Sequence, residues 1–129
     1  MADFPDRLLV EAFRSDPRRG EIVAFKIPPA AMVACGSGEP ATFIKRLIGL
    51  PGDRWREQDG FIYVNGKKLN EPYVEAWRRD RDTIPEKTVP KDQFVVLGDN
   101  RSPSCDSRRW GTVPRKNLVG RVVKIYRQS

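Results

Sequence analysis

The chain has 129 residues, with 24 Lys and Arg against 17 Asp and Glu, no His, and a formal net charge of +7. This length fits one domain, and the 39% of apolar residues is enough for one modest core. Without His, a Ser-His-Asp or Cys-His apparatus is excluded, and a zinc site would need an unusual ligand set. No apolar run approaches the ~20 residues of a membrane helix, so we expect the chain as it stands to be soluble.

The positive charge is compatible with nucleic acid, anionic lipid or an acidic protein as a partner. Its distribution favours a solvated surface, because residues 78–82 mix three Arg with two Asp instead of forming a basic track. A nucleic-acid-binding β-barrel is therefore an alternative that rests on net charge alone. The three Trp are scattered along the sequence and form no stacking pattern, so we expect no nucleic-acid partner.

The first half of the chain predicts short strands separated by turns. Residues 7–13 have mixed periodicity and predict a strand or a short helix, and Glu21–Phe25 predicts a strand. Residues 28–40 are rich in Pro, Gly and Ala and predict a long loop. Residues 42–50 are β-prone and end at Pro51-Gly52-Asp53, which is a strong turn signal.

A hairpin is predicted in the middle of the chain. The apolar residues 61–64 and the short segment 67–69 flank Asn65-Gly66. This dipeptide suits a two-residue turn because both of its positions need positive φ.

The second half continues the same pattern. Residues 75–92 are charged and interrupted by Pro, which predicts a loop, whereas 94–97 predict a buried strand. Residues 98–112 predict a polar loop, and 118–126 a final strand. Many short strands between turn signals predict a mainly β fold, an antiparallel coiled sheet or barrel, in a single domain over residues 1–129.

Lys45 and Arg46 are adjacent cations inside the apolar segment 42–50. Alternate side chains of a strand share a face, so one of the two cations must lie among apolar neighbours. A desolvated lysine has a lowered pKa, and its neutral amine can act as a general base. On the local pattern alone, a lysine that packs its stem on the sheet and extends its ammonium to water is favoured.

Residues 98–108 are dense in hydrogen-bonding side chains and follow the strand at 94–97. Polar loops that are fixed on rigid strands are common places for function. A surface turn with local bonds from side chains to the backbone explains the composition equally well.

Together these segments resemble the type I signal peptidases. Residues 45–53, Lys-Arg-Leu-Ile-Gly-Leu-Pro-Gly-Asp, look like the lysine box of that family, and 98–111 look like its C-terminal box. Residues 19–23 and the segments 65–67 and 71–73 also match the family in the right order. The similarity runs from about Asp6 to about Tyr126 and favours a functional interpretation of Lys45.

The resemblance implies a serine endopeptidase that removes signal peptides with a Ser/Lys dyad and needs no metal or cofactor. Substrate would lie as an added strand, with small residues at the first and third positions before the cut. The implied roles are general base for Lys45 and its orientation for Ser104, and substrate binding for Phe43 and Ile44. A charged cluster that braces the site is implied for Asp106, Arg108 and Arg46, and shaping of the loop for Asp99 and Asn100.

The nucleophile of the family lies in a Ser-Met-x-Pro box shortly before a segment resembling residues 6–10. Only Met1–Pro5 precede that segment here, and the other serines are out of register. We therefore expect no peptidase activity from the chain as it stands. A chain cut after the box, a misplaced start and a non-catalytic paralogue that binds signal peptides all explain this, and retention of Lys45 and Ser104 favours the cut.

The resemblance also implies that the parent protein lies at a cell membrane, with this domain on the extracytoplasmic side, where disulfides persist. A Cys35–Cys105 bridge beside the site is therefore our hypothesis, and two free thiols are the alternative. The basic charge would assist contact with an anionic membrane surface, although an ordinary solvated surface explains it as well.

Overall fold

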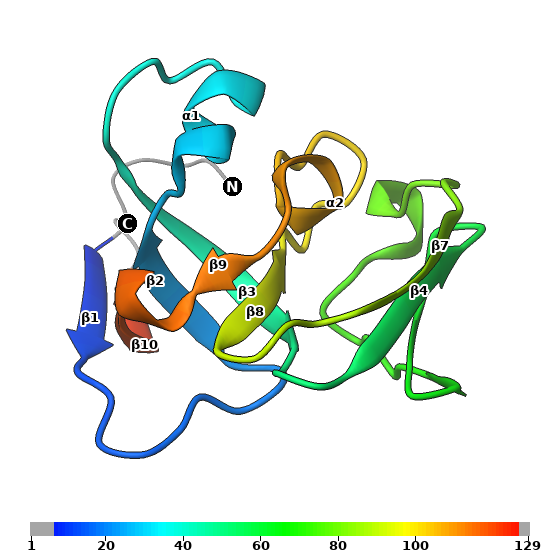
Figure 1. The fold of residues 1–129 in the computed structure, drawn as a ribbon, viewed down its shortest axis with the longest axis horizontal. Coiled ribbons are helices and arrows are strands. Elements are labelled where there is room, and N and C mark those ends of the chain that lie inside the picture. Colours follow the sequence, from blue (N-terminus) through cyan, green and yellow to red (C-terminus); the bar gives the residue numbers. More distant parts are fainter. Residues whose placement is uncertain (1–6, 127–129) are drawn as a thin grey trace.

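The computed structural model describes residues 7–126, which form two antiparallel sheets and a few short helices (Figure 1). The six-stranded sheet has the order β1-β10-β2-β3-β8-β9 and the four-stranded sheet the order β6-β5-β4-β7. The strands are β1 (Arg7–Glu11), β2 (Ile22–Lys26), β3 (Thr42–Gly49), β4 (Arg54–Gln58), β5 (Phe61–Val64), β6 (Lys67–Lys68), β7 (Ile84–Thr88), β8 (Gln93–Leu97), β9 (Val113–Pro114) and β10 (Leu118–Tyr126). The prediction of a mainly β, antiparallel fold is confirmed.

Strand β3 runs between two apolar cores. Leu47 packs with Phe25 in the first core, whereas the next residue, Ile48, packs with Trp55 in the second. Adjacent residues of a strand point to opposite faces, so β3 contributes one buried side chain to each core. Each fully buried side chain of this size contributes about 1.5–3 kcal/mol.

The predicted hairpin is confirmed. Strands β5 and β6 pair with Val64 opposite Lys67, and the turn between them consists of Asn65 and Gly66. Their φ angles are 52° and 83°, so both residues adopt the left-handed conformation that this dipeptide favours.

Three helical segments lie inside regions predicted to be loops. Helix α1 (Pro29–Ala34) falls within 28–40, the 3-10 helix η1 (Ala76–Arg78) within 75–92, and α2 (Ser107–Trp110) within 98–112. In α1, proline occupies the first turn, where its missing N–H costs nothing, and alanine is the best helix former. A second 3-10 helix, η2 (Arg115–Asn117), precedes β10. Within residues 7–126, no helix is both long and apolar enough to cross a bilayer.

The sequence analysis did not predict strands β4 and β7. In β4 the inward positions belong to Trp55 and Glu57, so a carboxylate interrupts the apolar alternation. Strand β7 contains Pro85, and its region was predicted to be a loop. Proline is tolerated there because β7 is an edge strand of the four-stranded sheet.

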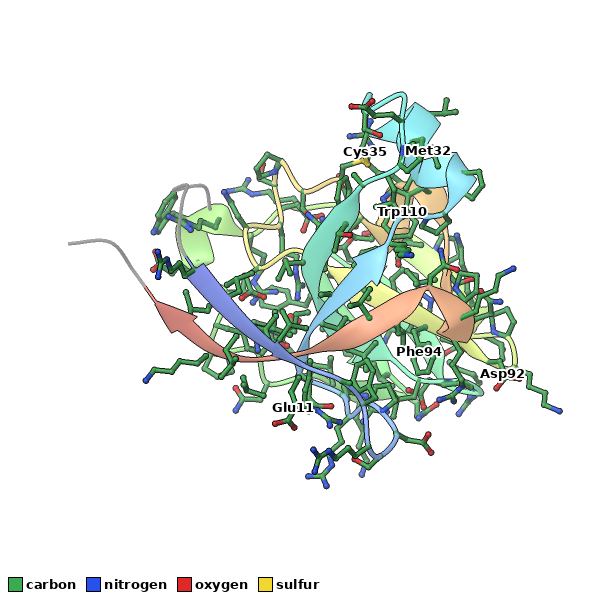
Figure 2. The ribbon with its side chains drawn as sticks, turned by 90° about the vertical axis from the view of Figure 1, so that its left-hand side faces the viewer. Glu11, Met32, Cys35, Asp92, Phe94 and Trp110 are labelled. Carbon is green, nitrogen blue, oxygen red and sulfur yellow. A yellow bond between two sulfur atoms is a disulfide. The ribbon has the colours of Figure 1, made fainter. Side chains whose placement is uncertain are left out.

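A disulfide joins the end of α1 to the loop that follows β8. Cys35 and Cys105 are bonded, with their Cα atoms 5.8 Å apart, so the bridge hypothesis is confirmed. Figure 2 shows Cys35 beside Met32 at one end of the molecule, with Trp110 below them. These residues pack on the first core, and the bridge therefore fastens the loop to a rigid part of the fold.

Candidate active site

The pairing of β3 with β8 brings Lys45 and Ser104 together. Arg46 on β3 is the partner of Leu97 on β8, so the loop after Leu97 begins beside Lys45. Ser104 lies in this loop, and the Nζ atom of Lys45 donates a hydrogen bond to its Oγ atom at 3.2 Å. Both side chains are partly buried. Two residues 59 positions apart in the chain thus form one polar pair.

Burial lowers the pKa of Lys45 below its ordinary value, since the desolvated ammonium loses hydration. The negative charge of Asp106 acts against this shift, and the positive charge of Arg108 acts with it. The weaker effect of Asp99 also opposes the shift. The net shift is downward, so Lys45 loses its proton more easily than an exposed lysine and its amine is suited to act as a base.

Gly98 leaves the space in which the Lys45–Ser104 pair meets. A Cβ atom added to Gly98 would overlap the Oγ and Cβ atoms of Ser104 and would lie 3.4 Å from Lys45 Nζ. The residue is therefore required for close approach and not for an unusual backbone conformation. Any side chain here would push Ser104 away from the lysine.

Asp106 fixes the loop that carries Ser104. One carboxylate oxygen accepts hydrogen bonds from the backbone N–H of Arg108 at 3.1 Å and from its Nε at 2.9 Å. The other accepts from the backbone N–H of Gly98 at 3.1 Å. Asp106 is fully buried, so these charge-assisted bonds hold both ends of the segment 98–108.

Arg46 extends from the opposite face of β3 and binds Asp99 in a bidentate pair, with both nitrogen–oxygen distances 2.8 Å. The same guanidinium lies 3.9 Å from the ring centroid of Tyr73. Arg46 therefore pairs with Asp99 and not with Asp106, although the sequence analysis grouped it with Asp106 and Arg108. The contacts of Arg46 with Asp99 and Tyr73 hold the beginning of the loop in place.

A buried ion cluster ties the loop to the segment before η1. The guanidinium of Arg101 is fully buried and donates to Glu71 at 2.6 Å. Arg79 contacts the same carboxylate at 3.0 Å, and Arg101 also donates to the carbonyl oxygen of Gly98 at 2.8 Å. Glu71 thus supports the backbone of Gly98 through Arg101.

A second cluster surrounds Arg108. Its NH1 atom contacts Glu57 at 3.3 Å and Asp80 at 3.0 Å. Burial and the neighbouring Asp80 raise the pKa of Glu57, Arg108 opposes the rise, and the resulting pKa is about 8. Asp82 lies close enough to these two carboxylates for the three to hold a cation, but Arg108 already supplies positive charge to the pair.

The remaining predicted site residues have the following positions. The ring of Phe43 packs edge-on against Phe25, with centroids 6.3 Å apart, and lies 5.8 Å from Lys45 Nζ. Ile44 is half-buried and opposite Ala24 in the β2–β3 ladder. The half-buried Asn100 makes no side-chain hydrogen bond to any residue between 7 and 126.

Sequence reasoning missed Gly98, Glu57 and Glu71 as parts of this region. Gly98 opens the polar loop and was included only as the first residue of the segment that resembles the C-terminal box. Glu57 alternates with Trp55, and that alternation was the signal for a buried carboxylate. For Glu71, no local pattern indicates that its charge meets Arg101, which lies 30 residues later.

The same fold occurs in a solved relative. A crystal structure of a signal peptidase I from Enterococcus faecalis superposes with a TM-score of 0.66 and 31% sequence identity, covering 85% of this chain and 98% of that one. The family model described as signal peptidase, peptidase S26, matches residues 3–127. The chain therefore belongs to the signal peptidase family, peptidase S26.

Curated relatives agree with this assignment. A probable signal peptidase I-2 of Synechocystis is 50% identical over 90% of this chain and 52% of its own length. A signal peptidase I of Leptolyngbya laminosa is 45% identical over 92% of this chain and 58% of its own. A thylakoidal processing peptidase 1 of Arabidopsis thaliana is 36% identical over 96% of this chain and 37% of its own. The chain spans about half the length of the first of these relatives.

Proposed function

We propose that this chain is the part of a signal peptidase that holds the general base, Lys45, and its orienting residue, Ser104. The observation that carries the proposal is the 3.2 Å contact between Lys45 Nζ and Ser104 Oγ at a lysine whose pKa burial lowers. Membership of the signal peptidase family supports the reaction class.

In the proposed reaction, the neutral amine of Lys45 takes the proton from the hydroxyl of a nucleophilic serine in the Ser-Met-x-Pro box. The serine oxygen bonds to the carbonyl carbon of the scissile amide. The C–N bond then breaks, and the proton passes from Lys45 to the leaving amine. Water hydrolyses the resulting ester with Lys45 again as the base. The hydrogen bond to Ser104 keeps the amine aimed at the reacting oxygen.

The proposed substrates are signal peptides of exported preproteins. They would lie along β3, where Phe43 and Ile44 border the lysine, with small residues at the first and third positions before the cut. Phe43 is held by Phe25, so its ring is a fixed wall that a large substrate side chain would clash with. The proposed location is a cell membrane, with this domain on the extracytoplasmic side.

The test uses two chains and one signal-peptide substrate. The 129-residue chain by itself is expected to bind the substrate without cleaving it. The same chain preceded by a Ser-Met-x-Pro segment, called the extended chain here, is expected to cleave it. Cleavage by the 129-residue chain would refute the assignment of the nucleophile to the preceding box.

Lys45→Met in the extended chain is expected to abolish cleavage and to leave substrate binding intact, because methionine keeps the stem and removes the amine. Lys116→Met removes an exposed lysine and is the matched control. If Lys45→Met cleaves at the rate of the control, Lys45 is not the base. If a folded extended chain neither binds nor cleaves the substrate, the proposed function is wrong.

A membrane surface is the second proposed partner. Apolar side chains of the paired strands β1 and β10 are exposed, including Leu8 at 39% and, opposite it, Ile125 at 38%. With the net positive charge, this strip suits the interface of an anionic bilayer. Co-flotation with vesicles of anionic lipid, lost in Leu8→Asp and absent with neutral lipid, is the expected result; equal flotation of both chains would contradict it.

A further inference from the structure

A cavity of about 400 Å³ opens beside Ser104. One wall consists of residues 82–84, at the start of β7, and the other consists of residues of the loop and of α2 between 101 and 109. We propose that this cavity is the subsite for the first residues after the cleavage site, and that Arg109 favours an acidic residue there. The proposal deepens the proposed function and rests on it.

The cavity adjoins the Lys45–Ser104 pair without including its lysine. Ser104 belongs to the wall, whereas Phe43, Ile44 and Lys45 of β3 do not. Substrate residues before the cut lie over β3 in the proposed function. A chain that crosses the scissile bond beside Lys45 and continues past Ser104 therefore enters this cavity.

An extended peptide also finds backbone partners at this place. Strand β7 is an edge of the four-stranded sheet, and its first residue, Ile84, lines the cavity. Edge strands present unpaired backbone N–H and C=O groups, which an extended segment can use for β-augmentation. Pro85 follows and has no N–H, so the docking is confined to the residues around Ile84.

Charge indicates which residues the cavity prefers. Arg101 and Arg108 line it, but they are committed to the carboxylates of Glu71, at 2.6 Å, and Asp106, at 2.9 Å. The carboxylate of Asp82 lies in the cluster around Arg108. Arg109 is exposed, and no carboxylate among residues 7–126 forms an ion pair with it. Its guanidinium is thus free to pair with an acidic side chain of the peptide.

Photo-crosslinking locates the two halves of the substrate separately. The probes are signal peptides whose scissile amide is replaced by a methylene-amine bond, with benzoylphenylalanine at one position on either side of that bond. After crosslinking to the 129-residue chain, reduction and trypsin digestion, probes at the first four positions after the cut are expected to label fragments 82–87 and 102–108. A probe at the second position before the cut, which is not one of the two positions that need small residues, is expected to label fragment 27–45.

The two possible failures are distinguishable. If the probe before the cut labels 27–45 while the probes after the cut avoid 82–87 and 102–108, the cavity is not the subsite and the proposed function stands. If the probe before the cut also fails to label 27–45, the proposed function itself is wrong. Labelling of all three fragments by every probe would show unspecific binding and would overturn the proposal.

A charge exchange tests the role of Arg109. Peptides with Glu at one of the first four positions after the cut are expected to bind roughly two- to fivefold more tightly than those with Lys, the effect of an exposed ion pair. Arg109→Glu is expected to reverse the preference, whereas Arg14→Gln, which removes an exposed arginine outside the cavity, is expected to keep it. Both variants change exposed side chains, so equal melting temperatures are the control for folding. An unchanged preference in Arg109→Glu refutes the selective role.

Discussion

Gly98 shows how a single missing side chain determines the spacing of two others. In Gly98→Ala, the new methyl group would overlap Ser104 and displace it from Lys45. Since misplacement by about 1 Å can cost about 100-fold in rate, we expect cleavage by the extended chain to fall by ten- to 100-fold. The measurement is the initial cleavage rate at several pH values.

The pH profile separates this effect from a general loss of stability. Displacement of Ser104 changes the surroundings of Lys45, so the midpoint at which the rate rises with pH should move in Gly98→Ala. Ser15→Ala, an exposed position outside this loop and outside the proposed subsite, is the control and should keep both rate and midpoint. A Gly98→Ala chain with the control's rate would contradict the steric argument.

Glu57 should make the stability of the fold depend on pH. Its pKa is raised from 4.5 to about 8 in the folded chain, so between these values the folded state binds a proton that the unfolded state releases. The stabilisation from this group is complete below pH 4.5 and is lost as the pH rises through about 8. In Glu57→Gln the glutamine is neutral at every pH, so this variant does not lose stability as the pH rises through about 8.

Melting temperatures of Glu57→Gln and the parent chain between pH 5 and pH 9 measure the difference. We expect the stability of the variant, relative to the parent, to rise up to about pH 8 and then to level off. Other titrating groups contribute equally to both chains, so the difference isolates Glu57. Two parallel curves would show that Glu57 is ionised in the folded chain throughout.

At the scale of elements, the Cys35–Cys105 bridge joins α1 to the loop of Ser104 and closes a segment of 70 residues. The double variant Cys35→Ser, Cys105→Ser should lower the free energy of unfolding by about 2–5 kcal/mol, since the unfolded chain gains freedom. Urea unfolding of the two chains gives this value. The double variant should be insensitive to a reducing agent; if the parent chain is insensitive too, the bridge contributes nothing.

The elements that the sequence predicted correctly are those with local signals. The turn at Asn65-Gly66 depends on the φ preferences of two residues, and the buried strand at 94–97 on a continuous apolar run. Strand β7 could not be predicted, because proline normally excludes a strand and only its edge position permits it. Edge position is a property of the assembled sheet, which local patterns do not contain.

The same difference between local signals and properties of the assembled fold applies to the candidate site. The lysine and loop segments were recognised from their ordered motifs, and the structure brings Lys45 and Ser104 within hydrogen-bond distance. The partner of Arg46 was not recognised, because a charge pattern indicates that a cluster exists without indicating which carboxylate each arginine meets. The cluster of Glu71 with Arg101 was missed for the same reason.

At the scale of the whole molecule, the loop of Ser104 lies against the four-stranded sheet and the segment before η1, and buried contacts between an arginine and a carboxyl group cross both. Glu57 of β4 reaches Arg108, and Glu71 reaches Arg101. Glu71→Ala leaves Arg101 as a buried charge without its partner, which should cost about 3–5 kcal/mol of unfolding free energy. Urea denaturation measures the loss.

Glu86→Ala is the matched control, because its exposed contact with Arg54, at 3.9 Å, should contribute less than about 1 kcal/mol. Equal losses in Glu71→Ala and Glu86→Ala would mean that the buried cluster does not hold the loop to the rest of the molecule.

The disulfide between α1 and the loop also affects when the site can be completed. Disulfides form in oxidising compartments, so on the proposed extracytoplasmic side the bond would be made only after export. A newly synthesised copy would carry two thiols, and it would lack the covalent bond that holds the loop of Ser104 beside Lys45. Maturation of such a molecule would end with the oxidation of Cys35 and Cys105. The time since export would then decide whether Lys45 and Ser104 are held together.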